Sequence, residues 1–318
     1  MAASKKTVLI TGSTRGIGLA FAEYYTKAGW NVIGTARAGS NTDKLAALSP
    51  FKIVTLDAGD EATVLDTARQ LDGVPIHLLI NNAGIGVYST FETATKADIM
   101  KVFEVNAVGP FLATRALLPN LKLATDTQTP AIVLQITSIM GSIACNNDEH
   151  AQLFRGQYGY TTSKAALNMI THSLAMDLRE HGVAVVTVNP GYVDTDMTHH
   201  QGVVKPADTV SAMADIVAKL KLEDTSKFFN ADPTIPVPSE SQNTEIADGD
   251  SVDGKSFAEK FAVRWWQHNL RSYKKMAGLL EKMNIDTRAG KDLIEDLEAW
   301  TSKHFGEGNI IPSSELPW

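Results

Sequence analysis

The sequence predicts an α/β fold, a doubly wound parallel sheet of about seven strands followed by a helical C-terminal extension. Over the first two-thirds of the chain, short β-branched and aliphatic runs alternate with longer segments of helical periodicity, as in βαβ units. These runs are apolar throughout, as expected of strands that are buried on both faces. A glycine cluster follows the first run at the point where a helix should begin.

The elements follow in order along the chain. Strands are predicted at residues 6–10, 31–35, 52–56, 78–81, 131–137, 184–188 and 227–229. Helices are predicted at residues 17–28, 61–71, 95–123, 160–180 and 206–222. Asp60 precedes the second helix as an N-cap, and Thr95 with Asp98 forms a capping-box pattern before the third. Gly182 is a C-terminal glycine, and Pro206 suits the first turn of the last helix.

The chain divides at residue 232 into a domain, 1–232, and an extension, 233–318. Residues 231–254 hold three prolines and many Ser, Asp and Glu, which predicts a linker or an exposed loop. Helical periodicity then resumes and predicts helices at 256–283 and 287–304. Because Trp265, Trp266 and Trp300 lie here, the extension should bury apolar surface, either in its own core or on a partner subunit, or as a lid over the active site.

Composition narrows the class of protein. With 318 residues, 44% hydrophobic content and a net charge of −7, the chain can build a core and lacks the basic balance of a nucleic-acid-binding protein. Its one cysteine, Cys145, allows no intrachain disulfide and suits a reducing compartment. The first apolar run ends by Gly12, too early for a signal peptide or a membrane span. We expect a cytoplasmic protein with no nucleic-acid or membrane partner.

The glycine cluster spans residues 11–18, between a strand and a helix. Gly12 permits a tight turn, while Gly16 and Gly18 let the backbone approach a pyrophosphate that rests on the helix N-terminus. Thr14, Arg15 and Ile17, which lie in the same loop, are therefore also expected to contact the cofactor. The alternative is an ordinary strand–helix turn.

Residues at the next strand ends indicate which dinucleotide binds. The end of the second strand, residues 34–37, includes Arg37 and lacks the acid that holds a ribose 2′-hydroxyl in NAD enzymes. Arg37, with Arg15, is placed to hold a 2′-phosphate, which predicts NADP(H); either arginine alone could be a surface charge. Asp57 could accept from the adenine amino group or cap a helix.

The loop after the fourth predicted strand is small and polar. Asn82, Ala83 and Gly84 leave room for the adenosine ribose, although the same residues also suit a simple turn.

Five motifs in a fixed order resemble the short-chain dehydrogenase/reductase family, over about residues 5–230. The resemblance implies a Rossmann fold and a nicotinamide-dependent oxidoreductase. The matching positions are residues 11–18, residues 81–84, Asn106, Ser138, and residues 160–164, followed by residues 189–191 and Thr195.

The resemblance assigns the chemistry to four side chains. Tyr160 can protonate a carbonyl oxygen if its pKa is lowered, and Lys164 lies one helical turn away on the same face. The family implies that Lys164 also holds the nicotinamide ribose, that Ser138 orients the substrate oxygen, and that Asn106 holds a water linking Lys164 to solvent. Tyr158 is an alternative acid, but it lacks a lysine four residues later.

The family also implies that Pro190, Gly191, Val193 and Thr195 face the nicotinamide. The 22 positions from Ser138 to Tyr160 exceed the usual spacing, and the surplus at 145–157 should lie beside the substrate. His150 with its acidic neighbours is interpreted as a solvated loop, and no metal is expected.

These patterns predict an NADP(H)-dependent oxidoreductase that reduces a ketone or aldehyde of a small organic molecule to an alcohol, with Tyr160 as general acid. Two alternatives stay open: a non-redox isomerase or cyclase on the same scaffold, and a nucleotide-sensing interaction protein. Family members often assemble through the helices predicted at 95–123 and 160–180, so a homodimer or homotetramer is expected.

Overall fold

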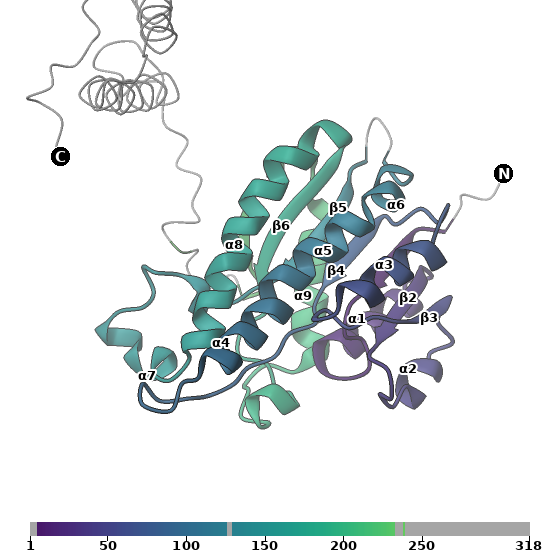
Figure 1. Ribbon diagram of the computed structural model, residues 1–318. Coiled ribbons are helices and arrows are strands. Elements are labelled where there is room, and N and C mark those ends of the chain that lie inside the picture. Colours follow the sequence, from purple (N-terminus) through teal and green to yellow (C-terminus); the bar gives the residue numbers. More distant parts are fainter. Residues whose placement is uncertain (1–4, 126–128, 233–237, 239–318) are drawn as a thin grey trace, which may run out of the picture. The chain divides into compact units, whose positions relative to one another are not determined.

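The computed structural model describes residues 5–125, 129–232 and 238 (Figure 1). The two helices predicted in the extension and the linker from residue 239 onward lie outside the described residues. The division at residue 232 therefore stays a prediction.

A seven-stranded, fully parallel sheet forms the centre of the described domain, with strand order β3-β2-β1-β4-β5-β6-β7. The predicted doubly wound α/β fold is confirmed. The order reverses between β1 and β4, which is where sheets of this kind open a crevice at the carboxyl ends of their strands. The strands are β1 Thr7–Ile10, β2 Asn31–Ala36, β3 Lys52–Thr55, β4 Leu78–Asn81, β5 Ala131–Ile136, β6 Val183–Asn189 and β7 Phe228–Asn230.

Helices cover both faces of the sheet (Figure 1). They are α1 Gly16–Lys27, α2 Asp43–Ala46, α3 Glu61–Gln70, α4 Lys96–Phe103, α5 Gly109–Ala116, α6 Leu118–Lys122, α7 Ala151–Phe154, α8 Tyr158–Leu178 and α9 Pro206–Lys219. Alternate strand residues enter opposite cores, because side chains of a strand point to its two faces in turn. Val8 and Ile10 pack with Phe21 of α1 and Met213 of α9, whereas Leu9 packs in the core that holds Leu174 of α8.

Most helix-end signals are confirmed. The Asp60 carboxylate accepts from Ala62 N–H, the Thr95 hydroxyl accepts from Asp98 N–H, and Gly182 adopts φ 71° after α8. The last predicted helix ends at Lys219 rather than at residue 222. The short helices α2 and α7 were missed because four-residue helices carry too little periodicity to detect.

The helix predicted at 95–123 is wrong as a single α-helix. Between α4 and α5 the chain makes a π-helical turn, Glu104–Val108, that contains Asn106. Pro110 explains part of this departure, because proline has no N–H to offer the carbonyl of residue 106 four positions earlier. π turns of this kind are frequent at functional sites.

Gly18, in the first turn of α1, is constrained by close packing. A Cβ there would overlap the Gly12 carbonyl oxygen and lie 2.6 Å from Nδ2 of Asn82. The glycine loop can therefore fold over α1 only if residue 18 has no side chain.

We expect Gly18→Ala to lower the free energy of unfolding by about 1–3 kcal/mol, the usual cost of overpacking, measured by denaturant unfolding. Gly86→Ala is the matched control, because its Cβ would meet only the Tyr160 ring, at 3.8 Å. Equal stability of the two variants would contradict the steric explanation.

Candidate active site

The predicted site residues meet at the carboxyl edge of the sheet. The glycine loop follows β1, the Asn82–Gly84 turn follows β4, Ser138 follows β5, and Gly191 follows β6. Close approaches connect these loops: a Cβ on Gly12 would lie 3.1 Å from Cα of Ala83, and one on Gly16 would lie 3.4 Å from Cγ2 of Thr195.

The N-terminus of α1 is suited to an anion. Its capping residue, Arg15, makes no side-chain cap, and the first turn contains no acidic residue. The positive end of the helix therefore meets no carboxylate of its own first turn. Gly16 takes φ 54°, a left-handed conformation that glycine adopts without strain.

Asn82 and Thr11 fix the glycine loop to the end of β4. Asn82 Nδ2 donates to the carbonyls of Thr11 and Gly12, at 2.9 and 3.1 Å. The Thr11 hydroxyl accepts from the N–H groups of Asn82 and Ala83, at 2.9 and 3.0 Å. The sequence predicts that Asn82 leaves room for a ribose; in the structure its amide also holds the glycine loop in place. The role of Thr11 is not predicted, because a lone threonine after a strand carries no specific signal.

A cavity of about 460 Å³ opens beside the ends of β2 and β3. It is lined by Arg37, Ala38, Gly39, Ser40, Thr55, Asp57, Asp60 and Thr63. Arg37 and Asp57, both predicted to contact the adenosine end of a dinucleotide, thus share one cavity. One oxygen of Asp57 accepts from Gly59 N–H at 3.0 Å, so this carboxylate also shapes the loop before α3.

Tyr160, Ser138 and Lys164 form one group. The Ser138 side chain lies close enough to Tyr160 to lower the pKa of the tyrosine through a side-chain hydrogen bond. Lys164 Nζ lies 5.7 Å from the centre of the Tyr160 ring and donates to the carbonyl of Ile136 at 2.8 Å. The spacing of four residues on α8 therefore places both side chains on one face, as predicted.

Burial governs the pKa values of this group. Loss of solvation lowers the pKa of Lys164 to about 8. It raises the pKa of Tyr160, and the hydrogen bond from Ser138 opposes that rise only partly. The expected lowering of the Tyr160 pKa is thus not found in the protein alone, because desolvation of the phenolate outweighs the stabilising groups.

The Asn106 side chain is fully buried, and both of its polar atoms make hydrogen bonds. Its Oδ1 accepts from Ile85 N–H at 2.9 Å, and its Nδ2 donates to the Ile85 carbonyl at 2.8 Å and to the Ser163 hydroxyl at 3.1 Å. The side chain therefore fastens the loop after β4 to α8. Pro110 leaves the main-chain carbonyl of Asn106 without its usual i+4 donor.

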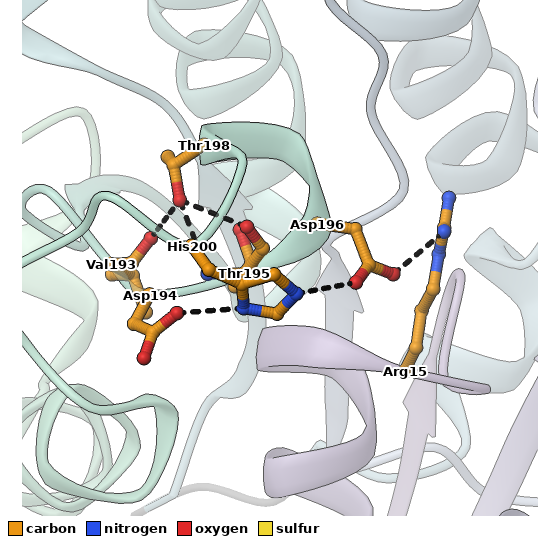
Figure 2. Close-up of polar contacts among 7 residues, drawn as sticks. All are labelled: Arg15, Val193, Asp194, Thr195, Asp196, Thr198 and His200. Atoms are coloured by element: carbon orange, nitrogen blue, oxygen red, sulfur yellow. Dashed lines mark hydrogen bonds and ion pairs between the residues drawn. The ribbon is translucent and has the colours of Figure 1, made fainter.

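The loop after β6 folds back on itself and carries Thr195 (Figure 2). Thr198 Oγ1 donates to the carbonyls of Val193 and Thr195, at 2.7 and 3.0 Å. Val193 pairs with Val204 in a parallel β-bridge. Two of the predicted nicotinamide contacts, Val193 and Thr195, thus belong to one compact unit.

Charged side chains of the same loop reach the glycine loop (Figure 2). Arg15 pairs with Asp196 at 2.8 Å, and His200 lies between Asp194 and Asp196 at 2.8 and 3.1 Å. Hydrogen bonding to Asp194, then to Asp196, raises the pKa of His200, while the hydrogen bond from Arg15 lowers that of Asp196. Sequence reasoning missed this network, because nothing in the spacing of residues 15 and 196 indicates their contact.

The surplus segment, 145–157, forms a 3-10 turn and α7. Gly156 accepts at its carbonyl from Ser89 N–H at 3.0 Å, and Tyr158 lies edge-on to Phe91, with ring centres 6.5 Å apart. The segment therefore packs against the loop after β4.

Within residues 5–125, 129–232 and 238, no three His, Cys, Asp or Glu side chains are grouped so that they could hold a metal ion. None of the helices in this part of the chain has both the length and the apolar character needed to cross a membrane.

The fold and the groups at this edge of the sheet define a Rossmann protein with a tyrosine–lysine pair on α8. Residues 6–203 match the family model described as short chain dehydrogenase, and the chain belongs to that family of oxidoreductases.

Three known proteins illustrate the similarity of this chain to other members of the family. The C-signal protein of Myxococcus xanthus is 37% identical over 157 residues, 49% of this chain and 89% of that protein. The NADP-dependent (R)-specific alcohol dehydrogenase of Lentilactobacillus kefiri is 31% identical, over 60% of this chain and 75% of its own length. An NADPH-bound carbonyl reductase from chicken fatty liver superposes with a TM-score of 0.64 at 32% identity, over 71% of this chain and 96% of the reductase.

The burial of Lys164 predicts a pH dependence of stability. Between pH 8 and pH 10 the folded lysine is largely neutral, whereas the unfolded lysine is still protonated and binds more protons. Stability should therefore rise with pH in this window, by on the order of 1 kcal/mol per pH unit from this group. Denaturant unfolding of the wild type and of Lys164→Met should show the steeper rise in the wild type; parallel curves would contradict it.

Proposed function

We propose that this protein is an NADPH-dependent reductase that converts a ketone or aldehyde of a small organic molecule to an alcohol. The observation that carries the proposal is the grouping of Ser138 and Tyr160 with Lys164, whose Nζ lies 5.7 Å from the centre of the tyrosine ring. A bound nicotinamide dinucleotide supplies the hydride. The side chains supply the proton and hold the reacting groups.

Each catalytic group has one task in this proposal. The Ser138 hydroxyl orients the substrate oxygen, and Tyr160 donates a proton to that oxygen as it becomes an alcohol. Lys164, charged below its pKa of about 8, stabilises the phenolate that remains. The main-chain carbonyl of Asn106 holds the water through which a proton returns from solvent.

In this proposal, the loops that follow different strands hold different parts of the dinucleotide. Gly12, Thr14, Gly16, Ile17 and Gly18 hold the pyrophosphate on the N-terminus of α1, next to Ala83 and Gly84. Arg37 and Asp57 receive the 2′-phosphate and the adenine in the cavity beside β2 and β3. Lys164, Pro190, Gly191, Val193 and Thr195 meet the nicotinamide end.

Support for NADPH over NADH comes from charge. Arg37, a cation and not an acid, directly follows β2, so a 2′-phosphate finds a positive charge there and a 2′-hydroxyl finds no carboxylate at that position. The alcohol dehydrogenase of L. kefiri is NADP-dependent by name, and the chicken carbonyl reductase contains NADPH.

We expect Tyr160→Phe to abolish reduction in a panel of carbonyl compounds while NADPH binding stays within a few-fold of wild type, because only the proton donor is removed. Tyr158→Phe, which alters an exposed tyrosine in the same helix without a partner lysine, is the matched control and should keep its activity. Comparable turnover of the Tyr160 variant would exclude it as the acid.

Arg37→Ala should weaken NADPH binding by on the order of tenfold or more, because a charge-assisted contact to the 2′-phosphate is lost, and should leave NADH binding nearly unchanged. Arg69→Ala, an exposed arginine paired with Asp66 on α3, is the control. Isothermal titration with both nucleotides measures the ratio; equal losses for both would contradict the assignment.

Consumption of NADPH distinguishes the proposed reductase from two other functions. An isomerase or cyclase would bind NADPH without net oxidation, and a sensing protein would bind it without any turnover. The relative named C-signal brings the second of these into consideration. The described arrangement of Ser138, Tyr160 and Lys164 favours carbonyl reduction over both.

We further propose a cytoplasmic homodimer or homotetramer that contacts through α4, α5 and α8. These helices expose Met100, Met169 and Met176, at 52%, 67% and 80% of their full accessible area, which is apolar surface available for a subunit contact.

A further inference from the structure

We infer that Asn168 is a positioning residue for the proposed reduction, and that its hydrogen bond to Thr137 keeps Ser138 in line with Tyr160. This inference rests on the proposed function, since it takes Ser138 and Tyr160 to act on one substrate oxygen. Asn168 has no place among the proposed contacts to substrate or cofactor. Its effect should therefore appear in the rate of the chemical step and not in the binding of the nucleotide.

The hydrogen bond joins α8 to the residue that directly precedes Ser138. The Thr137 hydroxyl donates to Oδ1 of Asn168 at 2.6 Å, across 31 positions of the sequence. Thr137 follows the last residue of β5 and is buried, and its N–H donates to the carbonyl of Val188 in β6 at 2.9 Å. A buried hydroxyl needs a partner, and α8 provides it. Both the backbone and the side chain of Thr137 are thus held in place.

The spacing along α8 places Asn168 in a series with the tyrosine–lysine pair. Tyr160, Lys164 and Asn168 are four residues apart, so they lie on successive turns along one side of the helix. Lys164 donates to the carbonyl of Ile136 at 2.8 Å, and Asn168 accepts from the next residue, Thr137. Two consecutive residues at the carboxyl end of β5 are therefore tied to two consecutive turns of α8.

The chain that follows Ser138 is also fixed against α8. The Ser138 Oγ accepts from Met140 N–H at 3.1 Å, within the 3-10 turn Ile139–Gly141. Gly141 lies close enough to Lys164 that a Cβ there would be 2.7 Å from the lysine's backbone carbon. The alignment of Ser138 with α8 thus depends on contacts made directly before and directly after it.

The two bonds at the end of β5 have different demands during turnover. Lys164 carries a charge on a long, flexible stem, and the proposed function engages its ammonium with Tyr160 and with the nicotinamide ribose. Thr137 and Asn168 are short and uncharged, so their bond can persist while the lysine changes its contacts. It then keeps the Ser138 hydroxyl directed at the substrate oxygen. Because a misplacement of about 1 Å can slow catalysis about 100-fold, this support should affect the rate.

The test is the steady-state reduction, by full-length Thr137→Val, of a ketone that the wild type accepts. Valine keeps the shape of the side chain and removes the donor. Loss of one neutral hydrogen bond should lower kcat by about three- to tenfold. The KM for NADPH should stay unchanged, since the bond acts on the alignment of the reacting groups and not on the nucleotide. Thr137→Ser, which keeps the hydroxyl, should retain the wild-type kcat.

Asn168→Leu removes the acceptor and should lower kcat by the same factor. The double variant should be no slower than the slower single variant, because the two changes remove one interaction. Each kcat is expressed per NADPH-binding site measured by titration, so that unfolded molecules do not contribute to it.

The matched control is Thr171→Val. It removes another buried hydroxyl of α8, one that donates to the Leu167 carbonyl within the same helix at 2.8 Å and makes no contact with β5. Its kcat should equal that of the wild type, so that the loss of a buried hydroxyl does not by itself explain a slow variant.

Four outcomes would overturn the role of Asn168: an unchanged kcat in Thr137→Val, the same fall in Thr171→Val, additive losses in the double variant, or an effect of Thr137→Val confined to the KM for NADPH. A wild type that oxidises no NADPH with any carbonyl compound would instead refute the proposed function, and the inference with it.

Discussion

The buried ammonium of Lys164 is the constraint on which the site depends. It is held by the carbonyl of Ile136 at the end of β5, in a region where burial makes a charge costly. That contact fixes α8 against the strand that leads into Ser138. Gly141 allows the approach, since a Cβ there would lie 2.7 Å from the backbone carbon of Lys164. The distance between serine and tyrosine is thus set by backbone packing.

The Asn106 side chain is a second contact that orders the site. It provides the hydrogen bonds that the loop at Ile85, which has no regular secondary structure, would otherwise lack. By bonding both the N–H and the carbonyl of Ile85, it acts as a strand partner would for a single residue. Its third bond, to Ser163, lies one residue from Lys164. The π turn that contains Asn106 therefore connects the loop after β4 to α8.

Local chemistry explains what the sequence could predict. Strands buried on both faces carry a strong apolar signal, and the glycine cluster, Asp60 and Gly182 each act through their own backbone. The π turn was missed because the periodicity of residues 95–123 changes little when one extra residue enters a turn. The pairing of Arg15 with Asp196 depends on two loops brought together by β1 and β6. The raised pKa of Tyr160 depends on burial, which no spacing of tyrosine and lysine reveals.

The hydrogen bond between Ser89 and Gly156 joins the segment before Tyr160 to the loop after β4. This contact is made by backbone atoms and so does not depend on the side chains at the two positions. Gly156, at φ 72°, sits at the joint and admits the Tyr88 ring where a side chain could not fit. Residues added or removed between 143 and 155 would alter this segment without altering β5 or α8. The length of the segment that we expect beside the substrate is thus independent of the elements that position the proposed catalytic residues.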